Sequence, residues 1–262
     1  MFRLATWNVN SVRIRTELLK RLIEEEKPDI ICLQEVKAKE TDFPFDDIRA
    51  LGYGHIALYG MPGYNGVAIL SKTPLYNIEK YQHVGRDDAR HISATTENGP
   101  EIHNIYIPAG GDIPDTAANP SFVHKLAFVD EAADFFEQRK GKSLLVCGDF
   151  NIAPLENDVW SHKAMSRIIS HTPVEIEKLT GFFNRGGFAD AVRKHYPEPQ
   201  KLYSWWSYRN PNWQTNDKGR RLDHVWVSSD ILPRVSNAKI CKDFRSAKRP
   251  SDHVPVIVDL EI

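Results

Sequence analysis

Short apolar runs separated by glycine, proline and asparagine recur along most of the chain and predict more strands than helices. The first run, residues 2–9, leads into apolar positions at helical spacing over 12–26, with Ser11 as the predicted N-cap. The same spacing predicts a longer helix over 121–139. Further strands are predicted over 29–34, 53–59, 66–70, 78–82, 91–95, 101–107, 144–148, 203–206, 222–227, 239–242 and 253–260, and further helical stretches over 161–170 and 173–181.

The order of these elements predicts the fold class. Strands come in runs that helices interrupt, which favours an α/β fold of mixed or antiparallel sheets packed face to face, with helices outside them. No tandem repeat, low-complexity tract or Gly/Ser linker divides the chain. We therefore expect residues 1–262 to form a single domain.

Five polar residues occupy related places in this strand pattern. Asn8, Glu35 and Asp149 lie at the ends of predicted strands, whereas Asp223 and His253 lie at or just before the starts of theirs. Ends and starts share one rim of a sheet when neighbouring strands run antiparallel. The five side chains are therefore expected to converge on one site.

Composition narrows the class of protein. Hydrophobic residues make up 41% of the chain and charged residues 26%, the usual mix for a globular protein with a substantial core. No apolar window reaches the length of a membrane span, and the N-terminal residues do not form a signal peptide. Cys32, Cys147 and Cys241 lie in or beside apolar runs without metal-type spacing. We interpret them as reduced core residues and expect a cytoplasmic protein.

Charge is unevenly distributed along the chain, although the net charge is only −1. Residues 193–249 hold thirteen Lys and Arg against five Asp and Glu, a balance of +8, so the remaining residues sum to −9. This asymmetry permits a surface that faces phosphates in the C-terminal third. Dispersed charges on a solvated face would explain it equally well.

The candidate residues include every group that phosphodiester hydrolysis requires. Glu35 and Asp252, helped by the amide oxygen of Asn8, are expected to hold a hard cation, because Mg²⁺ and Mn²⁺ bind carboxylate and carbonyl oxygens. Asp149 is the candidate base that activates water, and Asn151 the residue that orients the water or the phosphate.

Two further side chains are candidates for stabilising the phosphoryl oxygens. His253 would do so as an imidazolium held by Asp223, and Tyr106 would donate a hydrogen bond to the phosphate or the leaving oxygen. Each candidate alone has an ordinary structural explanation, since Asp and Asn suit turns and single histidines are usually structural. The prediction of an active site therefore rests on the combination.

Seven motifs carry a resemblance to a known family across essentially the whole chain. TWNVNSVR, LQEVK, YNGVAILSK, NIYIPAG, GDFNIAP, RRLDHVWVS and PSDHVPV occur in the order found in the exonuclease III family of AP endonucleases, which this sequence resembles. The resemblance implies a four-layered α/β sandwich and a Mg²⁺-dependent enzyme, with Mn²⁺ as a substitute. Such an enzyme cuts double-stranded DNA 5′ to abasic sites and acts as a 3′→5′ exonuclease and as a 3′-phosphatase or phosphodiesterase on blocked 3′ ends. We expect a monomer.

The resemblance also assigns roles by position. The metal-side residues match Asn8, Glu35 and Asp252, the active-site tyrosine matches Tyr106, the GD-x-N pair matches Asp149 and Asn151, and the acid–histidine pair matches Asp223 and His253. Asp149, Asn151 and His253 are also candidates for a second metal position. The number of metals and the acid that serves as base stay open, as does the balance between endonuclease and exonuclease activity.

Residues 203–224 mix aromatic with basic side chains, which is typical of a loop that faces DNA. An abasic nucleotide is easily flipped out, and a compact apolar pocket would select it by excluding intact bases. By resemblance, Trp205 and Leu222 line that pocket, Trp213 lies on the loop that enters DNA, and Arg221 binds substrate. Trp206 alternates with Trp205 in the predicted strand and is therefore expected in the core.

Three positions depart from the family pattern. Ala109 stands where a polar residue is common, which removes one contact to phosphate or sugar. Ser207 replaces a frequent Asp, and Arg220 occupies a position beside the pocket that is often apolar. Substrate preference is therefore left open.

Two other functions fit parts of the pattern. A secreted nuclease resembling DNase I, an inositol-phosphate phosphatase or a sphingomyelinase would share the chemistry. DNase I-like enzymes carry a histidine where Tyr106 stands and are commonly disulfide-bonded, and a small-molecule phosphatase would not need the aromatic–basic segment. A catalytically silent DNA-binding scaffold predicts the loss of metal or base positions, yet all of them are filled.

Overall fold

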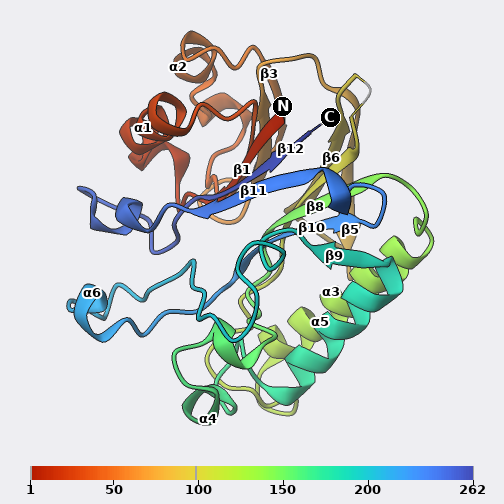
Figure 1. Ribbon diagram of the computed structural model, residues 1–262, viewed down its shortest axis with the longest axis vertical. Coiled ribbons are helices and arrows are strands. Elements are labelled where there is room, and N and C mark those ends of the chain that lie inside the picture. Colours follow the sequence, from red (N-terminus) through yellow and green to blue (C-terminus); the bar gives the residue numbers. More distant parts are fainter. Residues whose placement is uncertain (1, 98, 262) are drawn as a thin grey trace.

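Two sheets of six strands each form the centre of the computed structural model, which describes residues 2–97 and 99–261 (Figure 1). The first sheet contains β1 (Phe2–Asn8), β2 (Ile30–Gln34), β3 (His55–Tyr59), β4 (Val67–Ser71), β11 (Val235–Ile240) and β12 (Val256–Leu260), in the order β11-β12-β1-β2-β4-β3. The second contains β5 (Tyr76–His83), β6 (Arg86–Thr95), β7 (Glu101–Tyr106), β8 (Leu144–Asp149), β9 (Phe188–Asp190) and β10 (Asp223–Ser228), in the order β5-β6-β7-β8-β10-β9.

Helices cover the outer faces of both sheets. The first sheet is covered by α1 (Thr16–Glu26) and α2 (Phe45–Ala50), and the second by α3 (Pro120–Glu137) and α5 (Pro173–Gly186) (Figure 1). The short helices α4 (His162–Met165) and α6 (Trp213–Asn216) lie in loops, and 3₁₀ turns span Val12–Ile14, Glu40–Asp42, Glu156–Asp158, Leu232–Arg234 and Lys242–Ser246. The predicted four-layered α/β sandwich is therefore confirmed.

Strand periodicity decides which side chains reach the space between the sheets. Leu4 belongs to the core between the sheets, whereas Ala5 and Trp7 pack under the outer helices. Because side chains alternate along a strand, Asn8 points to the same face of the sheet as Leu4. At the end of β1, it therefore faces the other sheet. By the same alternation Asp149 follows Cys147, which lies in the same inter-sheet core. The polar residues at the strand ends thus extend the rows of the core.

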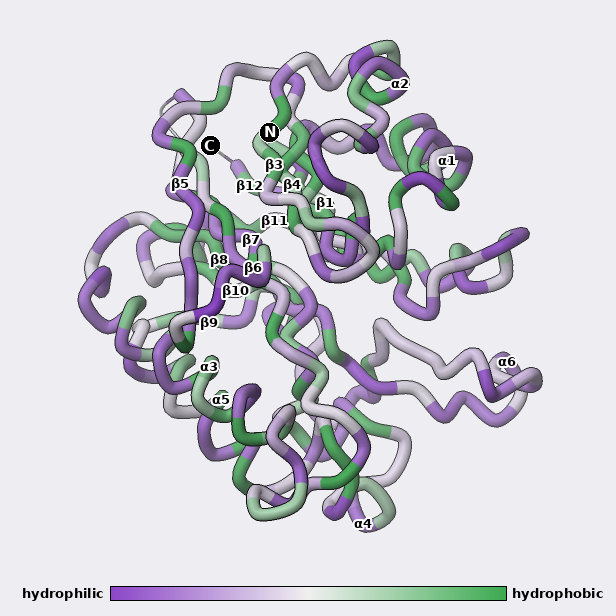
Figure 2. The backbone as a smooth tube through the Cα atoms, turned by 180° about the vertical axis from the view of Figure 1, so that it is seen from behind, coloured by the Kyte–Doolittle hydropathy of each residue, from purple (hydrophilic) through white to green (hydrophobic). Residues whose placement is uncertain are grey.

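Both sheets mix parallel and antiparallel pairs. β1 pairs in parallel with β2 and antiparallel with β12, and β7 pairs in parallel with β8. The chain termini lie close together at one end of the molecule, since Phe2 is paired with Leu260 (Figure 1). Hydrophobic segments follow the strands through the interior, while the loop that carries α6 stands out from the body and is largely hydrophilic (Figure 2). No described helix is both long and apolar enough to cross a membrane.

Several boundaries differ from the sequence prediction. The first helix begins at Thr16 rather than residue 12, because residues 12–14 form a 3₁₀ turn and the Ser11 side chain makes no capping hydrogen bond. The last strand begins at Val256, and β9, α2 and α6 were not predicted.

The predicted strand over 203–206 is wrong in kind, because it forms only isolated bridges. Trp205 N donates to Arg220 O at 3.0 Å, but Trp206 N turns to Asp252 O at 2.9 Å. Neighbouring backbone amides therefore bind different segments, and no continuous ladder develops.

Candidate active site

The strand ends that carry the candidate residues meet at one rim, as the sequence pattern predicts. Asp149, the last residue of β8, lies opposite Asp223 on antiparallel β10 and opposite Tyr106 on parallel β7. Asn8 ends β1 in the facing sheet, and Glu35 follows β2 directly. The rim is thus built from both sheets.

A buried histidine lies between two buried carboxylates at this rim. Nδ1 of His253 is 2.8 Å from Asp223 Oδ2, and Nε2 is 3.5 Å from Asp149 Oδ2. Burial opposes charge on the imidazole, but the carboxylates of Asp223 and Asp149 outweigh it and raise the pKa of His253 to about 10. The histidine is therefore an imidazolium at neutral pH.

Asp149 is poised between its charged and neutral forms. Burial raises the pKa of its carboxyl to about 7, although the charge of His253 acts in the opposite direction. Asn151 N donates to Asp149 Oδ1 at 2.9 Å, and Asn151 Nδ2 donates to Asp149 Oδ2 at 3.2 Å and to Ile107 O at 2.9 Å. A carboxyl group whose pKa lies near 7 suits a general base.

The residues around Asp149 allow this tight turn. Gly148 has φ +139°, and a Cβ there would lie 1.9 Å from the carbonyl oxygen of Ile105 on β7. Asn151 has φ +52°, a left-handed conformation that asparagine tolerates. Phe150 is fully buried against Trp226, with ring centroids 4.7 Å apart. The aromatic ring between the two polar residues is therefore packed into the core.

Asn8 connects the two acidic parts of the site. Its Nδ2 donates to Glu35 Oε1 and to Asp149 Oδ2, both at 2.9 Å. The amide oxygen, predicted to help hold a cation, accepts a hydrogen bond from Asn10 N at 3.1 Å. Asn8 therefore orients two carboxylates and is fully buried while doing so.

Glu35 and Tyr106 form a second connected pair. The Tyr106 hydroxyl donates to Glu35 Oε1 at 2.7 Å. Burial alone would raise the pKa of Glu35, but hydrogen bonds from Asn8 and Lys37 outweigh it and lower that pKa. Burial, together with the charges of Glu35 and Asp149, raises the pKa of Tyr106 well above its usual range. Tyr106 thus stays a neutral donor beside an ionised Glu35.

Two groups of oxygen and nitrogen donors suit a metal ion. The Lys37 ammonium group contacts Glu35 Oε2 at 2.8 Å and Asn10 Oδ1 at 2.7 Å, so these oxygens accommodate a positive charge. Asn10 Nδ2 also lies 3.3 Å from Asp252 Oδ1, which brings Asp252 to the same group. Sequence reasoning missed Asn10, although its position two residues after Asn8 at a strand end was a usable signal.

The second group consists of Asp149, Asp223 and His253, whose ligand atoms all lie within 4.8 Å of one another. Asp223 Oδ1 is buried and has no hydrogen-bond partner among the described residues. An unsatisfied buried carboxylate oxygen is costly. A metal ion or a bound donor would satisfy it, so both groups fit the predicted cation.

A cleft of about 340 Å³ opens beside these residues. Trp205 lines it, and its Nε1 donates to Asp252 Oδ2 at 2.9 Å. Leu222 is buried and packs in a small cluster that Trp205 joins. The catalytic and substrate candidates that line the cleft are Glu35, Tyr106, Asn151, Trp205, Leu222, Asp252 and His253, together with Ala109 and Arg220.

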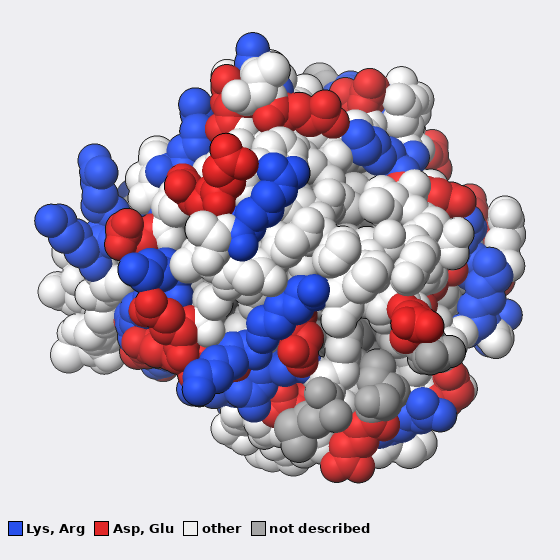
Figure 3. Space-filling model, turned by 90° about the horizontal axis from the view of Figure 1, so that it is seen from above, with Lys and Arg blue, Asp and Glu red and all other residues white. Residues whose placement is uncertain are grey.

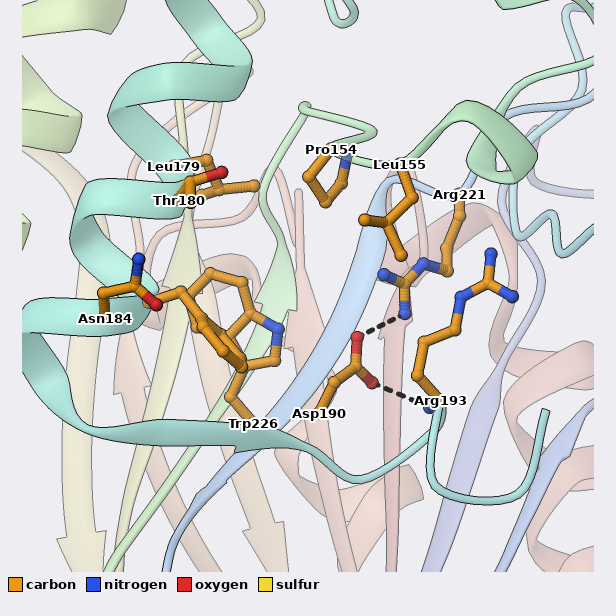
Figure 4. Close-up of a pocket in the computed structure, with 10 residues that line it drawn as sticks. Pro154, Leu155, Leu179, Thr180, Asn184, Asp190, Arg193, Arg221 and Trp226 are labelled. Atoms are coloured by element: carbon orange, nitrogen blue, oxygen red, sulfur yellow. Dashed lines mark hydrogen bonds and ion pairs between the residues drawn. The ribbon is translucent and has the colours of Figure 1, made fainter. Parts of the chain in front are cut away.

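Arg221 lies elsewhere, so its position does not support the predicted substrate contact. Its guanidinium group is 1% exposed and is bound by Asp158 at 2.9 Å and Asp190 at 2.6 Å. It lines a separate cavity of about 320 Å³ between α5, β9 and β10, where Asp190 also accepts a hydrogen bond from the Arg193 backbone (Figure 4). Two carboxylates thus satisfy Arg221 within the fold.

The other aromatic candidates divide between core and loop. Trp206 is 1% exposed, as predicted, and packs against Trp213 with ring centroids 5.2 Å apart. Trp213 lies on the protruding α6 loop, but its ring is buried against that loop's base. Ser207 Oγ accepts a hydrogen bond from Arg209 N at 3.2 Å, a local turn contact.

A buried ion pair behind the cleft was not predicted from the sequence. Lys125 and Glu175 are both inaccessible to solvent, with Nζ 2.5 Å from Oε1. Lys125 Nζ also donates to Asn151 O at 2.8 Å and to Ala109 O at 3.2 Å. It therefore fixes the two loops that follow β7 and β8. Its sequence signal was weak, since a lysine within a helix is usually exposed.

Comparison with known sequences and structures places this geometry among related proteins. A family model described as Endonuclease/Exonuclease/phosphatase family matches residues 5–253. Exodeoxyribonuclease III of Haemophilus influenzae is 30% identical, over 96% of this chain and 97% of that protein. The DNA repair nuclease APEX1 of Danio rerio is 31% identical, over 99% of this chain and 82% of that protein.

Solved structures agree closely in shape. An AP endonuclease from Archaeoglobus fulgidus superimposes with a TM-score of 0.92 at 27% identity, and covers all of both chains. A 3′ phosphatase, NExo, from Neisseria, bound to a product DNA hairpin, gives a TM-score of 0.92 at 28% identity, again over 100% of both chains.

Proposed function

The chain belongs to the Endonuclease/Exonuclease/phosphatase family, and from that premise we propose that it is a DNA repair nuclease that hydrolyses phosphodiester bonds with a divalent cation. We propose Mg²⁺ as the cation, with Mn²⁺ as a substitute, and duplex DNA carrying abasic sites or blocked 3′ ends as the substrate. The observation that carries the proposal is the Asp149–His253–Asp223 group at one rim, tied to Glu35 through Asn8.

Asp149 is the proposed general base. Its pKa of about 7 leaves a large ionised fraction at neutral pH while the carboxylate still accepts a proton readily. Asn151 and Asn8 fix the orientation of the carboxylate, since both donate to its oxygens. A water molecule held at Asp149 can therefore lose its proton to a positioned acceptor as it attacks phosphorus.

His253 and Tyr106 are the proposed donors to the phosphoryl group. The imidazolium of His253 is held by Asp223, which keeps one ring nitrogen bound and leaves Nε2 directed toward Asp149 and the cleft. Tyr106 is neutral and can donate its hydroxyl proton to an oxygen that gains charge. Both groups are fixed in advance by the fold, so the site needs little reorganisation during the reaction.

The cation would be held by Glu35 and Asp252 with Asn10. The Asp149–Asp223–His253 group would hold a cation through His253 only if the imidazole gave up a proton, and otherwise through its two carboxylates alone. When bound, a divalent cation neutralises charge on the phosphoryl oxygens and orients the substrate. The fit rests on oxygens of Glu35 and Asn10 that already contact the Lys37 ammonium group, with Asp252 next to Asn10, and on the unsatisfied Asp223 oxygen.

The loop that carries α6 is the proposed DNA-facing element. The loop projects from the body of the molecule (Figure 1), and Trp205 and Arg220 at its two ends line the cleft. It presents Tyr208, 48% exposed, with exposed Arg209 and Lys218. Cations on such a loop bind phosphates without regard to sequence. The face where the termini lie is a poorer candidate, because acidic and basic side chains mix over it (Figure 3).

We further propose that residues 1–262 act as one domain and a monomer, in the cytoplasm. The inter-sheet core supports a single domain, since it joins residues from Leu4 to Leu260. Cys32, Cys147 and Cys241 are free and buried, which suits a reducing compartment.

A parallel assay on three duplexes tests the function. With Mg²⁺, the protein should nick a duplex at the 5′ side of a single abasic analogue and release phosphate from a 3′-phosphate end. A blunt undamaged duplex reports the exonuclease activity and sets the balance between activities. The DNA function fails if all three strands stay intact while inositol phosphates are hydrolysed.

A further inference from the structure

The Arg220 side chain carries a charge that the fold does not neutralise. It lines the same cleft as Tyr106 and His253 and is half-buried. The carboxylate of Glu175 acts on the pKa of Arg220 through its charge, but it is already bound by Lys125 at 2.5 Å and by the backbone of Ser170. In the described part of the chain, no carboxylate forms an ion pair with Arg220.

Neutral groups hold this guanidinium in place. Nη1 donates to Ser170 Oγ at 2.9 Å and to Ile169 O at 3.2 Å. The guanidinium carbon lies 4.8 Å from the centroid of the Trp205 ring, a stacking distance. Nε and Nη2 make no hydrogen bond to the described residues, so one edge of the fork remains available for a ligand.

The neighbouring arginine shows what a satisfied buried guanidinium looks like in this fold. Arg221 is bound by two carboxylates, whereas Arg220 has only neutral acceptors and a ring. Burying a cation without a counter-charge is costly. A substrate anion that pairs with Arg220 would supply the missing counter-charge and offset this free-energy cost while it is bound. Arg220 is therefore suited to recognising an anionic group of the substrate.

The backbone places Arg220 close to the reacting group. Trp205 forms an isolated bridge with His253 on one side and with Arg220 on the other. His253, Trp205 and Arg220 thus lie side by side in that order, with Trp205 in the middle. If His253 contacts the scissile phosphate, Arg220 is separated from that phosphate by the width of Trp205. The anion that Arg220 binds must therefore belong to the part of the substrate attached beyond the scissile phosphorus.

We propose that Arg220 is a specificity-determining residue that selects substrates carrying a second anionic group beyond the scissile phosphate. This inference rests on the proposed nuclease function. A carboxylate is the best match, because the free edge of a guanidinium binds it through two parallel hydrogen bonds. A terminal glycolate ester and the backbone phosphate on the 3′ side of an abasic nucleotide both supply such a group.

The chemical step is the same for both substrates. Water adds its oxygen to phosphorus, the bond between phosphorus and the 3′ oxygen breaks, and the proton lost by the water is replaced on that 3′ oxygen by one from the site or solvent. The products are a 3′-hydroxyl end and a phosphate monoester that carries the anionic group. Arg220 takes no part in proton transfer and acts only on the departing fragment.

A matched pair of 3′ ends tests the proposal. One duplex ends in 3′-phosphoglycolate and the other in the 2-hydroxyethyl phosphate of equal length, which lacks the carboxylate. The wild-type protein should prefer the glycolate by about 10- to 100-fold in kcat/KM, the range expected for a charge-assisted contact. Arg220→Met should reduce that ratio to near one, and Arg220→Lys should keep part of it.

A second pair identifies the source of the anion. In a duplex with an internal abasic analogue, the phosphate on its 3′ side is replaced by a neutral methylphosphonate. If the wild-type protein cleaves the methylphosphonate duplex more slowly than the unmodified duplex, and Arg220→Met cleaves both at the same rate, then Arg220 contacts the backbone phosphate. Because each ratio compares substrates within one protein, a general loss of folding cancels.

The outcomes separate the two hypotheses. Equal rates within both pairs in an active wild-type enzyme would overturn the role of Arg220 and leave the nuclease function standing. Failure of the wild-type protein on every DNA substrate, the plain 3′-phosphate end and the abasic duplex included, would instead reject the function itself.

Discussion

Nε2 of His253 lies 3.5 Å from Oδ2 of Asp149, so an imidazolium and a carboxyl group of pKa about 7 face each other in a buried site. The distance exceeds that of a direct hydrogen bond. The two groups can therefore influence each other's charge while each keeps an atom for the substrate. The following predictions test this arrangement and the parts of the fold that support it.

Asp149→Asn should abolish strand cleavage while DNA binding persists. The amide preserves shape but cannot accept the proton of water, and loss of a general base costs about 10²- to 10⁴-fold in rate. Single-turnover cleavage of an abasic duplex measures the rate, and a filter or anisotropy assay measures binding. Asp46→Asn is the matched control, because that carboxylate is fully exposed on α2, at 100%. Retained cleavage in Asp149→Asn would remove Asp149 from the base role.

Removal of metal should stop the reaction, and two variants should change the metal requirement in opposite directions. Glu35→Gln removes the charge of a proposed ligand and should raise the Mg²⁺ concentration for half-maximal rate by about tenfold or more. Asn10→Asp adds a carboxylate beside Asp252 and should lower it. Direct titration with Mn²⁺ provides a readout independent of activity. The assignment of this group fails if both variants bind Mn²⁺ as the wild type does.

Trp205→Ala should weaken selection of abasic sites more than general binding to duplex DNA. The ring lines the cleft and its Nε1 holds Asp252 at 2.9 Å, so Trp205→Phe separates the two roles. Phenylalanine keeps an apolar wall but loses that hydrogen bond. Competition between abasic and intact duplexes measures selection. Equal losses on both duplexes in the alanine variant would contradict a role in selection.

Lys125→Met should destabilise the fold by about 3–5 kcal/mol, because it leaves the Glu175 carboxylate buried without its partner. Urea unfolding measures the difference. Lys178→Met, which breaks the more exposed pair with Asp130, should cost only about 0–1 kcal/mol. Activity should fall with Lys125→Met as well, because Lys125 Nζ donates to Asn151 O. Equal decreases in the free energy of unfolding for the two variants would contradict a larger contribution of the buried pair to stability.

Three buried histidines should make stability fall in acid. His83, His91 and His103 form a hydrogen-bonded chain with two contacts of 2.9 Å, facing Glu101, Glu131 and Arg139. Burial, together with the neighbouring histidines, lowers the pKa of His91 well below its usual value. His91 therefore binds a proton near pH 6.5 in the unfolded chain but stays neutral in the folded chain at that pH. The free energy of unfolding is thus highest above pH 6.5 and decreases as the pH falls below it.

Urea unfolding between pH 7 and pH 5 measures this loss. His91→Gln removes one group that gains a proton on unfolding, so the slope of unfolding free energy against pH should decrease by up to about 1.4 kcal/mol per pH unit. The exposed His55→Gln on β3 serves as the control. An unchanged slope in His91→Gln would assign the acid sensitivity to other groups.

The sequence predicted the site better than it predicted the elements around it. Asn8, Asp149 and Asp223 could be located because strand ends follow from apolar runs, and strand pairing then brings them together. The segment 203–206 could not, since its amides bind two different partners that local pattern does not reveal.

Adjacent arginines show the limit of position-based inference. Arg221 was predicted to bind substrate, yet Asp158 and Asp190 hold it inside the fold, while Arg220 lines the cleft. Asp158 and Asp190 are distant in sequence, so their pairing with Arg221 depends on the tertiary structure. Lys125 was missed for the same reason, because Glu175 comes from another helix.

The 2.9 Å bond from Asn8 to Asp149 joins a residue of the first sheet to one of the second. The candidate active site therefore includes residues of both sheets, and its geometry depends on how the two sheets are aligned. A shift of about 1 Å between the sheets would move the Asp149 carboxylate relative to Asn8 and leave the pairing within each sheet unchanged. The cleavage rate should therefore report the alignment of the two sheets, which a measurement of secondary-structure content would not detect.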